Sequence, residues 1–416
     1  MSTGSVVVVG GGVIGTACAY YLSKTGWNVT VLDKGKHGWG CSHANCGYVS
    51  PSHVLPLTVP GAAREAFFSL FQRNAPFAVR PRFDPALWGW FLRFMARCNR
   101  KDMLVAARGI QALLNSSRSL YDQLFREEPI DCEWQTLGTL FVLQTQAGME
   151  HFAERNKLLA ESFNLPAKRF DGAALNELEP ALKPGLAGGW LYESDAHLRP
   201  DRLMAEWRRI IEGQGVIVRE DCEVQGFAGT NGSARAVVTS AGELPADAFV
   251  VATGAWTPFL NRHLGCKIPI QPGKGYSITM ARPARCPTYP ILLEEHHVGI
   301  TPMKTGYRLG STMEFAGYDT TLNRQRLQLL RDGARIYLHE PFGEPVTEEW
   351  FGWRPMTYDS LPIIDRSPAL ANVHIAAGHN MLGLSMATGT GKLVTELMSG
   401  QLPHVDPTPY SVRRFG

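Results

Sequence analysis

The sequence predicts an α/β fold with a Rossmann-like dinucleotide-binding domain, and three observations lead to this class. An apolar run at residues 6–9 precedes a glycine-rich turn, a proline-free helical pattern covers residues 16–24, and a second apolar run at residues 29–32 ends on Asp33. A strand, a glycine turn, a helix and a strand in this order are typical of a βαβ unit of about 30 residues. We therefore expect a doubly wound sheet whose first strand is residues 6–9.

The turn carries three glycines at the spacing GxGxxG, Gly10, Gly12 and Gly15. The first permits the tight turn, the second lets a pyrophosphate approach the backbone, and the third lets the helix pack close to the strand. The start of the helix offers N–H groups and a positive dipole end to phosphate. Asp33 follows the last glycine by 18 residues, where its carboxylate can accept ribose hydroxyls and would repel a 2′-phosphate. These features predict a dinucleotide site that fits NAD or FAD.

The remaining elements follow from periodicity and from breaking residues. Residues 35–61 are rich in Gly, Ser, His, Asn and Pro and lack periodicity, which indicates an ordered loop near a ligand. Helical patterns dominate residues 64–128, with aromatic-rich stretches at 67–71 and 86–95. Further helices are expected at residues 201–212, after Pro200, and at 385–399, before Gly400. Strand patterns occur at residues 137–143, 188–192, 216–219, 247–254, 275–280, 298–301, 307–311 and 374–377.

The composition describes an ordinary globular protein and disfavours several classes. The chain has 416 residues, of which 44% are hydrophobic and 19% charged, and its net charge is only +3. That balance disfavours a nucleic-acid partner, which a broad basic surface would bind. We find neither the roughly 20 apolar residues of a membrane-spanning helix nor a secretory signal. Eight cysteines without a CxxC pair are typical of reduced thiols, so we expect a cytoplasmic location.

Two later segments favour FAD over NAD. Thr253 and Gly254 place small residues at the end of a predicted strand, and a second glycine loop at residues 378–383 precedes a helix. A flavin needs this second approach because its N1/O2 edge becomes anionic on reduction, and a helix N-terminus can stabilise that charge. We therefore expect an FAD-binding domain from residues 1–63, 196–265 and 352–416. An interleaved α+β substrate-binding domain, built on a mixed sheet, is expected from residues 64–195 and 266–351.

These motifs, together with residues 41–47, 50–51, 273–277 and 352–357 in this order, resemble the D-amino-acid dehydrogenase small-subunit family. This family belongs to the FAD-dependent amine oxidoreductases, with glycine and sarcosine oxidases, and the resemblance spans nearly the whole chain. It implies oxidative deamination of a small amino-acid substrate by hydride transfer to flavin N5, giving a 2-oxo acid and ammonia. Reoxidation would use a quinone, a carrier protein or oxygen. His43, Cys46 and Asp365 depart from the residues common in the family, which leaves the substrate's identity open.

The resemblance also implies which residues hold the cofactor. Gly10, Gly12, Val13, Ile14 and Gly15 would line the pyrophosphate. The adenosine end would contact Asp33, Lys34 and Val224. Residues approaching the ribityl chain and flavin would be Cys41, Ser42, Ala44, Asn45, Gly47, Thr253, Gly254, Gly383, Leu384 and Ser385.

Arg354 matches the family position whose guanidinium holds the substrate carboxylate. A planar guanidinium can pair with both carboxylate oxygens and orient the amino acid toward the flavin; the alternative is a structural salt bridge. Tyr276, His53 and His379 are further candidates, Tyr276 as a ligand contact or packing residue, His53 in a loop that could cover the substrate, and His379 near the flavin. No side-chain base is indicated.

Several alternatives stay open. The protein could instead oxidise a secondary amine such as glycine, sarcosine, proline or hydroxyproline, modify tRNA, or serve as a non-catalytic FAD-binding subunit. The basic, aromatic stretch at residues 80–101 is either a helix lying on a membrane or a core helix with a solvated face. His296 and His297 are adjacent on a predicted strand and would point to opposite faces, so we expect no metal site. The sequence does not indicate an oligomeric state.

Overall fold

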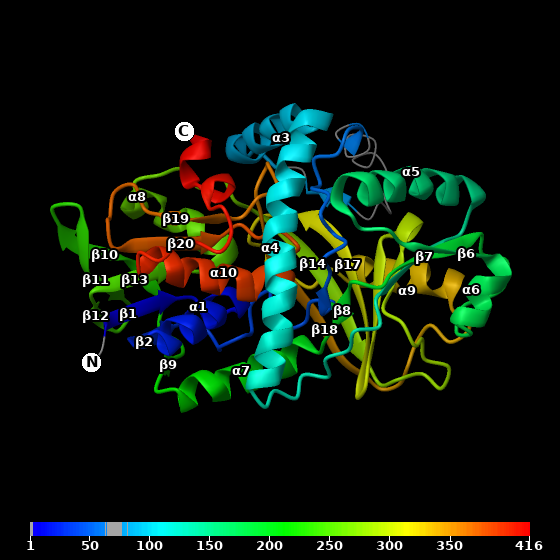
Figure 1. Ribbon diagram of the computed structural model, residues 1–416, viewed down its shortest axis with the longest axis horizontal. Coiled ribbons are helices and arrows are strands. Elements are labelled where there is room, and N and C mark those ends of the chain that lie inside the picture. Colours follow the sequence, from blue (N-terminus) through cyan, green and yellow to red (C-terminus); the bar gives the residue numbers. More distant parts are fainter. Residues whose placement is uncertain (1–2, 63, 65–76, 81) are drawn as a thin grey trace.

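The computed structural model describes residues 3–62, 64, 77–80 and 82–416. The stretch at residues 67–71, for which a helical pattern was expected, lies outside the described residues. Figure 1 shows two sheet regions beside one another, with the long helix α4 (Arg100–Glu127) crossing in front of them. The α/β fold class predicted from the sequence is confirmed.

The first sheet has the strand order β19-β20-β13-β1-β2-β9 in the described part of the chain. Its neighbouring strands pair in parallel, except that β19 runs antiparallel to β20. Val6 and Val8 face the helices on one side, whereas Val7 and Val9 face the other side, so both faces are buried. The predicted strands are confirmed as β1 (Gly4–Val9), β2 (Trp27–Leu32), β9 (Ile217–Arg219), β13 (Ala248–Val251) and β20 (Val373–Ala377), joined by β19 (Ile363–Arg366).

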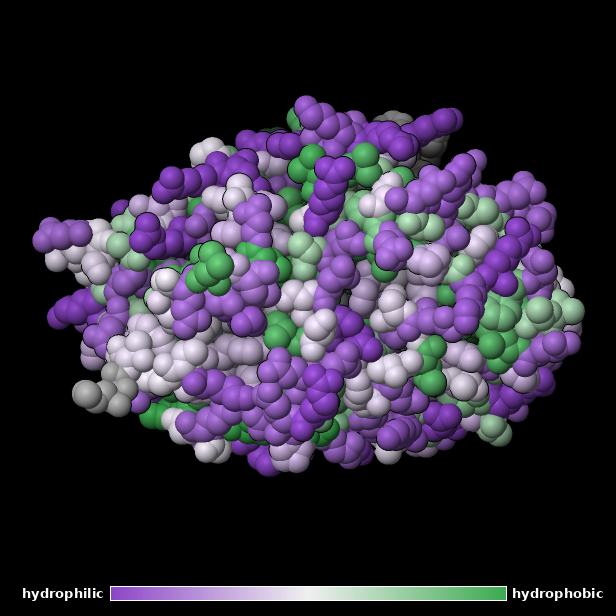
Figure 2. Space-filling view, viewed as in Figure 1, coloured by the Kyte–Doolittle hydropathy of each residue, from purple (hydrophilic) through white to green (hydrophobic). Residues whose placement is uncertain are grey.

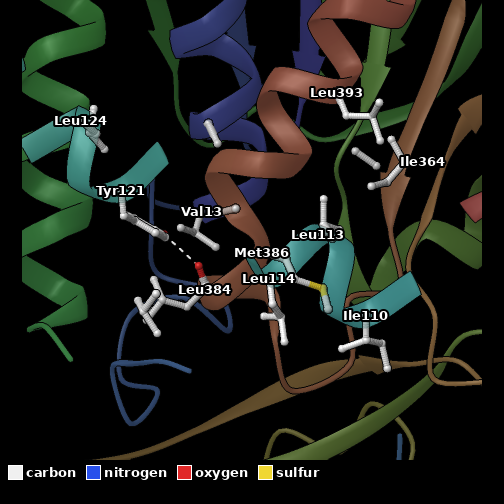
Figure 3. Close-up of a cluster of buried hydrophobic side chains, with 14 of the residues drawn as sticks. Val13, Ile110, Leu113, Leu114, Tyr121, Leu124, Ile364, Leu384, Met386 and Leu393 are labelled. Carbon is white, nitrogen blue, oxygen red and sulfur yellow. Dashed lines mark hydrogen bonds between the residues drawn. The ribbon is translucent and has the colours of Figure 1, made fainter. Parts of the chain in front are cut away.

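Helices α1 (Val13–Lys24) and α10 (Gly383–Met398) cover one face of this sheet and pack closely. A Cβ added at Gly391 of α10 would lie 2.6 Å from the backbone oxygen of Ala17 on α1. Helix α4 packs on α10, and the Tyr121 hydroxyl donates to the carbonyl of Leu384 over 2.8 Å. Figure 3 shows this hydrogen bond within the apolar cluster that joins the three helices. Helix α7 (Pro200–Gly213) packs against α1 as well.

The second sheet has the order β18-β14-β17-β16-β15-β5-β7-β6 among the described residues, with β4 beside β17. It is mixed, because β5 pairs with β15 and β4 with β17 in parallel, whereas the other pairs are antiparallel. Residue 352, where a domain boundary was predicted, lies inside β18. The domain limits remain predictions. The strands are β4 (Phe77–Val79), β5 (Thr139–Leu143), β6 (Lys168–Asp171), β7 (Gly188–Tyr192), β14 (Gln271–Met280), β15 (Ile291–Leu293), β16 (Val298–Met303), β17 (Gly306–Phe315) and β18 (Val346–Met356).

Short elements complete the fold. A small sheet is formed by β10 (Val224–Thr230), β11 (Ser233–Thr239) and β12 (Gly242–Pro245), and it packs in one apolar cluster with the first sheet. Separately, β3 (Tyr48–Val49) pairs with β8 (Ala196–His197). His296 ends the 3-10 helix η2 (Glu294–His296), and His297 follows with a positive φ of 49°. The expectation that both histidines lie on a strand was therefore wrong, because the chain turns there. The other helices are α3 (Pro85–Arg97), α5 (Gln146–Phe163), α6 (Gly172–Leu178), α8 (Asn261–Leu264), α9 (Arg324–Tyr337), η1 (Gly254–Leu260), η3 (Thr408–Tyr410) and η4 (Val412–Phe415).

The contact between α1 and α10 makes a testable prediction about stability. Gly391→Ala should lower the free energy of unfolding by about 1–3 kcal/mol, because the new methyl group overlaps the backbone of Ala17. Gly89→Ala in α3 is the matched control, since no described atom lies within 4 Å of the added Cβ. We expect that change to be neutral or slightly stabilising. Equal thermal unfolding curves for the two variants would contradict the proposed helix contact.

Candidate functional site

Four chain segments that carry predicted site residues meet at one edge of the first sheet. Gly10 follows β1, Asp33 follows β2, Thr253 follows β13, and the turn beginning at Gly378 follows β20. These four strands are parallel, so their carboxyl ends lie along the same edge. Ligands of open α/β sheets bind at this edge.

The glycine turn predicted to hold the pyrophosphate brings backbone segments into close contact. Gly10 has a φ of +110°, and a Cβ there would lie 2.4 Å from the carbonyl oxygen of Ala252. A Cβ at Gly15 would lie 1.8 Å from the Gly10 oxygen, so the start of α1 contacts the turn directly. Gly12 is the N-cap of α1 and has no side chain, and the N–H of Val13, the first helical residue, donates to the Ser42 hydroxyl over 2.9 Å. Helix α1 therefore begins at Val13, inside the glycine turn and three residues before the helical pattern predicted at residues 16–24.

Asp33 is held at the same edge by two backbone N–H groups. Its Oδ2 accepts from Gly11 over 2.7 Å and its Oδ1 from Gly35 over 2.9 Å. The Cys222 N–H donates to the Asp33 carbonyl over 2.8 Å, which brings the chain leading into Val224 beside it. The structure thus brings together the residues predicted for the adenosine end.

Lys34 contacts η1, the 3-10 helix that begins at Gly254. The Lys34 ammonium lies 3.8 Å from the centroid of the Trp256 ring in η1, and burial lowers the pKa of this lysine. Gly254 begins η1 with a φ of +55°, and no described atom lies within 4 Å of a Cβ placed on it. Beside it, the hydroxyls of Thr253 and Thr257 are 3.0 Å apart.

The start of α10 is hydrogen-bonded to residues 48–50, within the loop predicted at residues 35–61. Gly383, Leu384 and Ser385 form the first turn of α10, and no described side chain caps this helix. The Ser385 hydroxyl donates to the carbonyl of Tyr48 over 2.9 Å and accepts from the Ser50 N–H over 3.2 Å. The N-terminus of α10 therefore lies against the chain that joins the two large sheets.

The loop formed by residues 41–47 is closed by its own side chains. Asn45 donates from Nδ2 to the Ser42 carbonyl over 3.0 Å and accepts the Gly47 N–H over 2.8 Å. Gly47 has a φ of +79°, and a Cβ there would lie 2.1 Å from the carbonyl oxygen of Leu198. A glycine is required at that point because the two backbones touch.

Arg354 projects from β18 over the glycine backbone of β14. Its guanidinium carbon lies 2.4 Å from the position that a Cβ of Gly275 would occupy, so a side chain there would displace it. One nitrogen, Nη1, donates to the carbonyl of Thr312 over 2.7 Å. That carbonyl is presented by an irregular stretch of β17, where Ser311 and Thr312 both have positive φ values of 112° and 49°. Such strained pairs often lie at functional sites.

The charge of Arg354 has no acidic partner among the described residues. Burial lowers the pKa of Arg354, and the nearby thiols of Cys41 and Cys46 act in the opposite direction. Burial also raises the pKa of both thiols, while the guanidinium acts in the opposite direction. Arg354 and the loop formed by residues 41–47 are therefore neighbours. The Asn380 N–H, which donates to the Pro355 carbonyl over 3.2 Å, adds the second glycine loop to this group.

The other three substrate candidates point elsewhere. Tyr276 alternates with Gly275 on β14 and faces the opposite side of the sheet, where its hydroxyl donates to Glu314 over 2.5 Å. His379 lies 3.0 Å from the Thr390 hydroxyl of α10, and burial lowers its pKa to about 3. His53 lies beside the ring of Phe141, and burial lowers its pKa to about 3 as well. The structure brings none of these side chains into contact with Arg354.

Sequence reasoning did not single out the partners that hold this site in place. Thr312, Ser277, Thr301 and Arg308 contact Arg354 or the loop formed by residues 41–47, and all four lie on strands of the second sheet. Arg308 was the one signal in the sequence that could have indicated these contacts, because a charged residue is unusual in a strand predicted to be buried. Which backbone atoms these side chains reach depends on strand pairing between distant segments.

The fold and the site define a dinucleotide-binding oxidoreductase of the flavoprotein class. The defining features are a largely parallel sheet, its GxGxxG turn, an acidic residue after the second strand in sequence, and a second helix that starts at the same edge. The chain matches the model of the FAD dependent oxidoreductase (DAO) family over residues 5–397 and belongs to that family. It is 32% identical to D-amino acid dehydrogenase from Granulibacter bethesdensis and 33% identical to D-amino acid dehydrogenase from Xanthobacter autotrophicus, each over 99% of both chains.

Solved structures confirm the fold. Glycine oxidase from Geobacillus kaustophilus superposes with a TM-score of 0.77 at 21% identity and 99% coverage of both chains. L-proline dehydrogenase from P. horikoshii superposes with a TM-score of 0.73 at 21% identity, covering 100% of this chain and 98% of its own. FAD, the cofactor predicted from the sequence, is confirmed by the family. The residues present fit it, because the turn at Gly10 excludes side chains, Gly12 has no side chain to cap α1, and no described side chain caps the start of α10.

The position of Asp33 predicts a specific loss of cofactor affinity. Asp33→Ala should raise the Kd for FAD by about 10- to 100-fold, because a hydrogen bond to a charged group contributes about 1.5–3 kcal/mol. Titration of the apoprotein with FAD, followed by flavin fluorescence, measures this Kd. Asp247→Ala is the control, since that carboxylate also accepts a backbone N–H, from Ser5, but precedes a strand of the same sheet. The role of Asp33 is refuted if both variants bind FAD as the wild type does.

Proposed function

We propose that the protein catalyses the FAD-dependent oxidative deamination of a D-amino acid and that Arg354 binds the substrate carboxylate. One observation carries this proposal, the guanidinium of Arg354, which lies beside the cofactor-binding loop without an acidic partner among the described residues. The relatives named D-amino acid dehydrogenase support the choice of substrate.

An unpaired, partly buried cation is costly, which points to an anionic ligand. Leaving such a charge without a counter-ion costs several kcal/mol in a protein interior. Thr312 accepts one hydrogen bond from Nη1, and the remaining N–H groups of Arg354 can pair with both oxygens of a carboxylate. Gly275 keeps the face of β14 beside the guanidinium free of a side chain. An α-amino acid would thus be anchored by its carboxylate beside the flavin loop.

The chain's own contribution is to orient the substrate and to leave its amine neutral. When bound, FAD supplies the acceptor for the hydride on the substrate's α-carbon. Neither His53 nor His379 is set up as a base, because each has a pKa of about 3 and neither contacts Arg354. The amine would therefore lose its proton before the hydride leaves, and orientation by Arg354 would account for much of the rate. The resulting imine is hydrolysed by water to a 2-oxo acid and ammonia.

The reduced cofactor must then pass two electrons to an acceptor other than a nicotinamide. A quinone, a carrier protein or oxygen would each serve. Stopped-flow mixing of the reduced protein with a soluble quinone or with oxygen compares two of these acceptors directly.

Substitution of Arg354 tests the substrate site. In an anaerobic titration, D-amino acids should bleach the oxidised flavin absorbance. Arg354→Met should raise the Kd for substrate by at least about 100-fold, because a desolvated ion pair is lost, while FAD stays bound. Arg366→Met, a change at an exposed arginine on β19, is the control and should leave the Kd unchanged.

The choice of substrates separates the proposal from its rivals. L-amino acids, glycine, sarcosine, proline and hydroxyproline form the comparison panel. Faster bleaching by a secondary amine than by any D-amino acid would overturn the proposed substrate, and a flavin that no amine bleaches would indicate a non-catalytic subunit.

We also propose that α3 rests on the cytoplasmic face of a membrane. Trp88, Leu92 and Met95 recur at helical spacing and are 44%, 64% and 44% exposed, and Phe83 just before the helix is 98% exposed. Residues 82–108 carry six basic and two acidic side chains, a local net charge of +4 that exceeds the +3 of the whole chain. Figure 2 shows hydrophobic and hydrophilic residues interspersed along the top of the molecule, where Figure 1 places α3.

This combination is typical of a helix that lies in the membrane interface. Within the described residues, no helix is long and apolar enough to cross a bilayer. The buried side of α3 packs through Leu87 and Trp90, so its exposed apolar side chains face outward while the helix stays attached to the fold.

Vesicle binding tests the role of α3. The double variant with Arg93→Glu and Arg97→Glu should bind anionic vesicles at least about tenfold more weakly than the wild type, because each basic residue near the surface contributes about 1 kcal/mol. Cosedimentation with vesicles that contain phosphatidylserine measures the binding. Charge reversal at Arg262 and Arg366, away from α3, is the control. Unchanged cosedimentation of the α3 variant would exclude the membrane contact.

A further inference from the structure

Three consecutive carbonyl groups of the loop formed by residues 41–47 are held by three different strands of the second sheet. The Ala44 carbonyl accepts from the Ser277 hydroxyl of β14 over 2.8 Å. The Asn45 carbonyl accepts from Nη1 of Arg308 on β17 over 2.8 Å. The next carbonyl, that of Cys46, accepts from the Thr301 hydroxyl of β16 over 2.5 Å. The loop is therefore fixed to the sheet at successive peptide units.

The same loop is hydrogen-bonded to the start of α1 at its other end. The Ser42 hydroxyl accepts the backbone N–H of Val13, the first residue of α1, over 2.9 Å. The Asn45 side chain closes the loop between these two attachments through its hydrogen bonds to the backbone of Ser42 and Gly47. The loop thus links the second sheet to the start of α1 through hydrogen bonds.

The loop also packs directly on the glycine face of the second sheet. A Cβ at Gly310 would lie 2.6 Å from the sulfur of Cys46, and a Cβ at Gly299 would lie 3.3 Å from it. Gly310 pairs with Ser277, two residues from Gly275, over which the guanidinium of Arg354 lies. Diagonal neighbours of this kind in a sheet are about 7–8 Å apart. The loop and the proposed carboxylate anchor therefore lie over the same face of the second sheet.

Arg308 is the central side chain of this attachment. It is 1% exposed and reaches three groups, the Asn45 carbonyl, the Thr279 hydroxyl at 2.9 Å and the Asp201 carboxylate at 3.6 Å. Asp201 lies in the first turn of α7 and also accepts from Arg199. A planar guanidinium can contact a loop, a strand and a helix at once, whereas the ammonium of lysine cannot reproduce that geometry.

We propose that Arg308 is a positioning residue, which acts through the Asn45 carbonyl to set the place of the flavin relative to a substrate held by Arg354. This inference rests on the proposed function for the substrate and on the FAD-binding role of the loop for the cofactor. Loss of the guanidinium would leave Arg354 intact but let the loop shift, so substrate would still bind while the reacting atoms would be misaligned. A misplacement of about 1 Å can slow such a reaction about 100-fold.

Arg308→Gln and Arg308→Lys test this role in the holoenzyme. We expect the limiting rate of flavin reduction to fall by about 10- to 100-fold, with the substrate Kd unchanged within about twofold. The visible absorbance spectrum of bound FAD should shift, and the Kd for FAD should rise. Thr301→Val removes one neighbouring hydrogen bond to the loop and leaves a side chain of similar shape. It should produce smaller changes of the same kind, and it tests the proposal even if the Arg308 variants do not fold.

Lys274→Met is the matched control for the loss of a buried cation. Lys274 is also 1% exposed, but it lies on the opposite face of β14, where its ammonium donates to the carbonyl of Asp319 over 2.8 Å. This variant should lose stability without altering the flavin spectrum or the reduction rate. The proposal is overturned if the Arg308 and Thr301 variants keep the wild-type spectrum, FAD Kd and reduction rate. It is also overturned if Lys274→Met changes these three properties as much as the Arg308 variants do.

Failure of this inference can be told apart from failure of the proposed function. If no amino acid bleaches the wild-type flavin, the proposed reaction is wrong. The FAD Kd and the absorbance spectrum of the Arg308 variants would still report whether this arginine positions the cofactor loop.

Discussion

Close backbone contact between Gly10, Gly15 and Ala252 is the constraint on which the rest of the site depends. A side chain at either glycine would overlap a carbonyl oxygen, at 2.4 Å from Ala252 for Gly10 and at 1.8 Å from Gly10 for Gly15. This contact lets α1 begin where β1 ends, and it leaves the helix N-terminus facing the edge of the sheet. The second helix, α10, reaches the same edge because Gly391 lets it cross α1 at close range. Two helix N-termini thus lie at the edge where FAD is predicted to bind.

The charges that matter act locally, because the chain as a whole is nearly neutral. Asp33 is oriented by two backbone N–H groups at the predicted adenosine end, whereas Arg354 stands without an acidic partner among the described residues at the proposed substrate end. The carboxylate of Asp33 and the guanidinium of Arg354 can each bind a ligand strongly because few other charged groups of the described chain lie near them. Between them, the loop formed by residues 41–47 joins α1 to the second sheet through Ser42 and Arg308.

Most of the first sheet could be predicted because its signals are local. Apolar runs, glycine spacing and the helix after Pro200 depend on neighbours in sequence, and the corresponding strands and helices are found. Helices α5 and α9 were missed, although Leu327, Leu330 and Ala334 of α9 are buried at helical spacing, because charged residues dilute that pattern. Tyr276 lies in the expected strand, but the face to which it points follows from the pairing of β14 with its neighbours. A motif can therefore locate a residue without fixing the direction of its side chain.

The sequence by itself determined the α/β class and the dinucleotide site, because glycine spacing and strand order record backbone requirements that only certain residues meet, and the order of its motifs indicated FAD and the family by resemblance. The tertiary structure alone decided which side chains meet. It leaves Arg354 without an acidic partner in the described chain, turns Tyr276 to the far face of the sheet, and brings Arg308 to Asn45 across 263 residues. Such contacts join segments far apart in the chain, and their energies depend on desolvation and on strand register, which no local pattern of residues encodes.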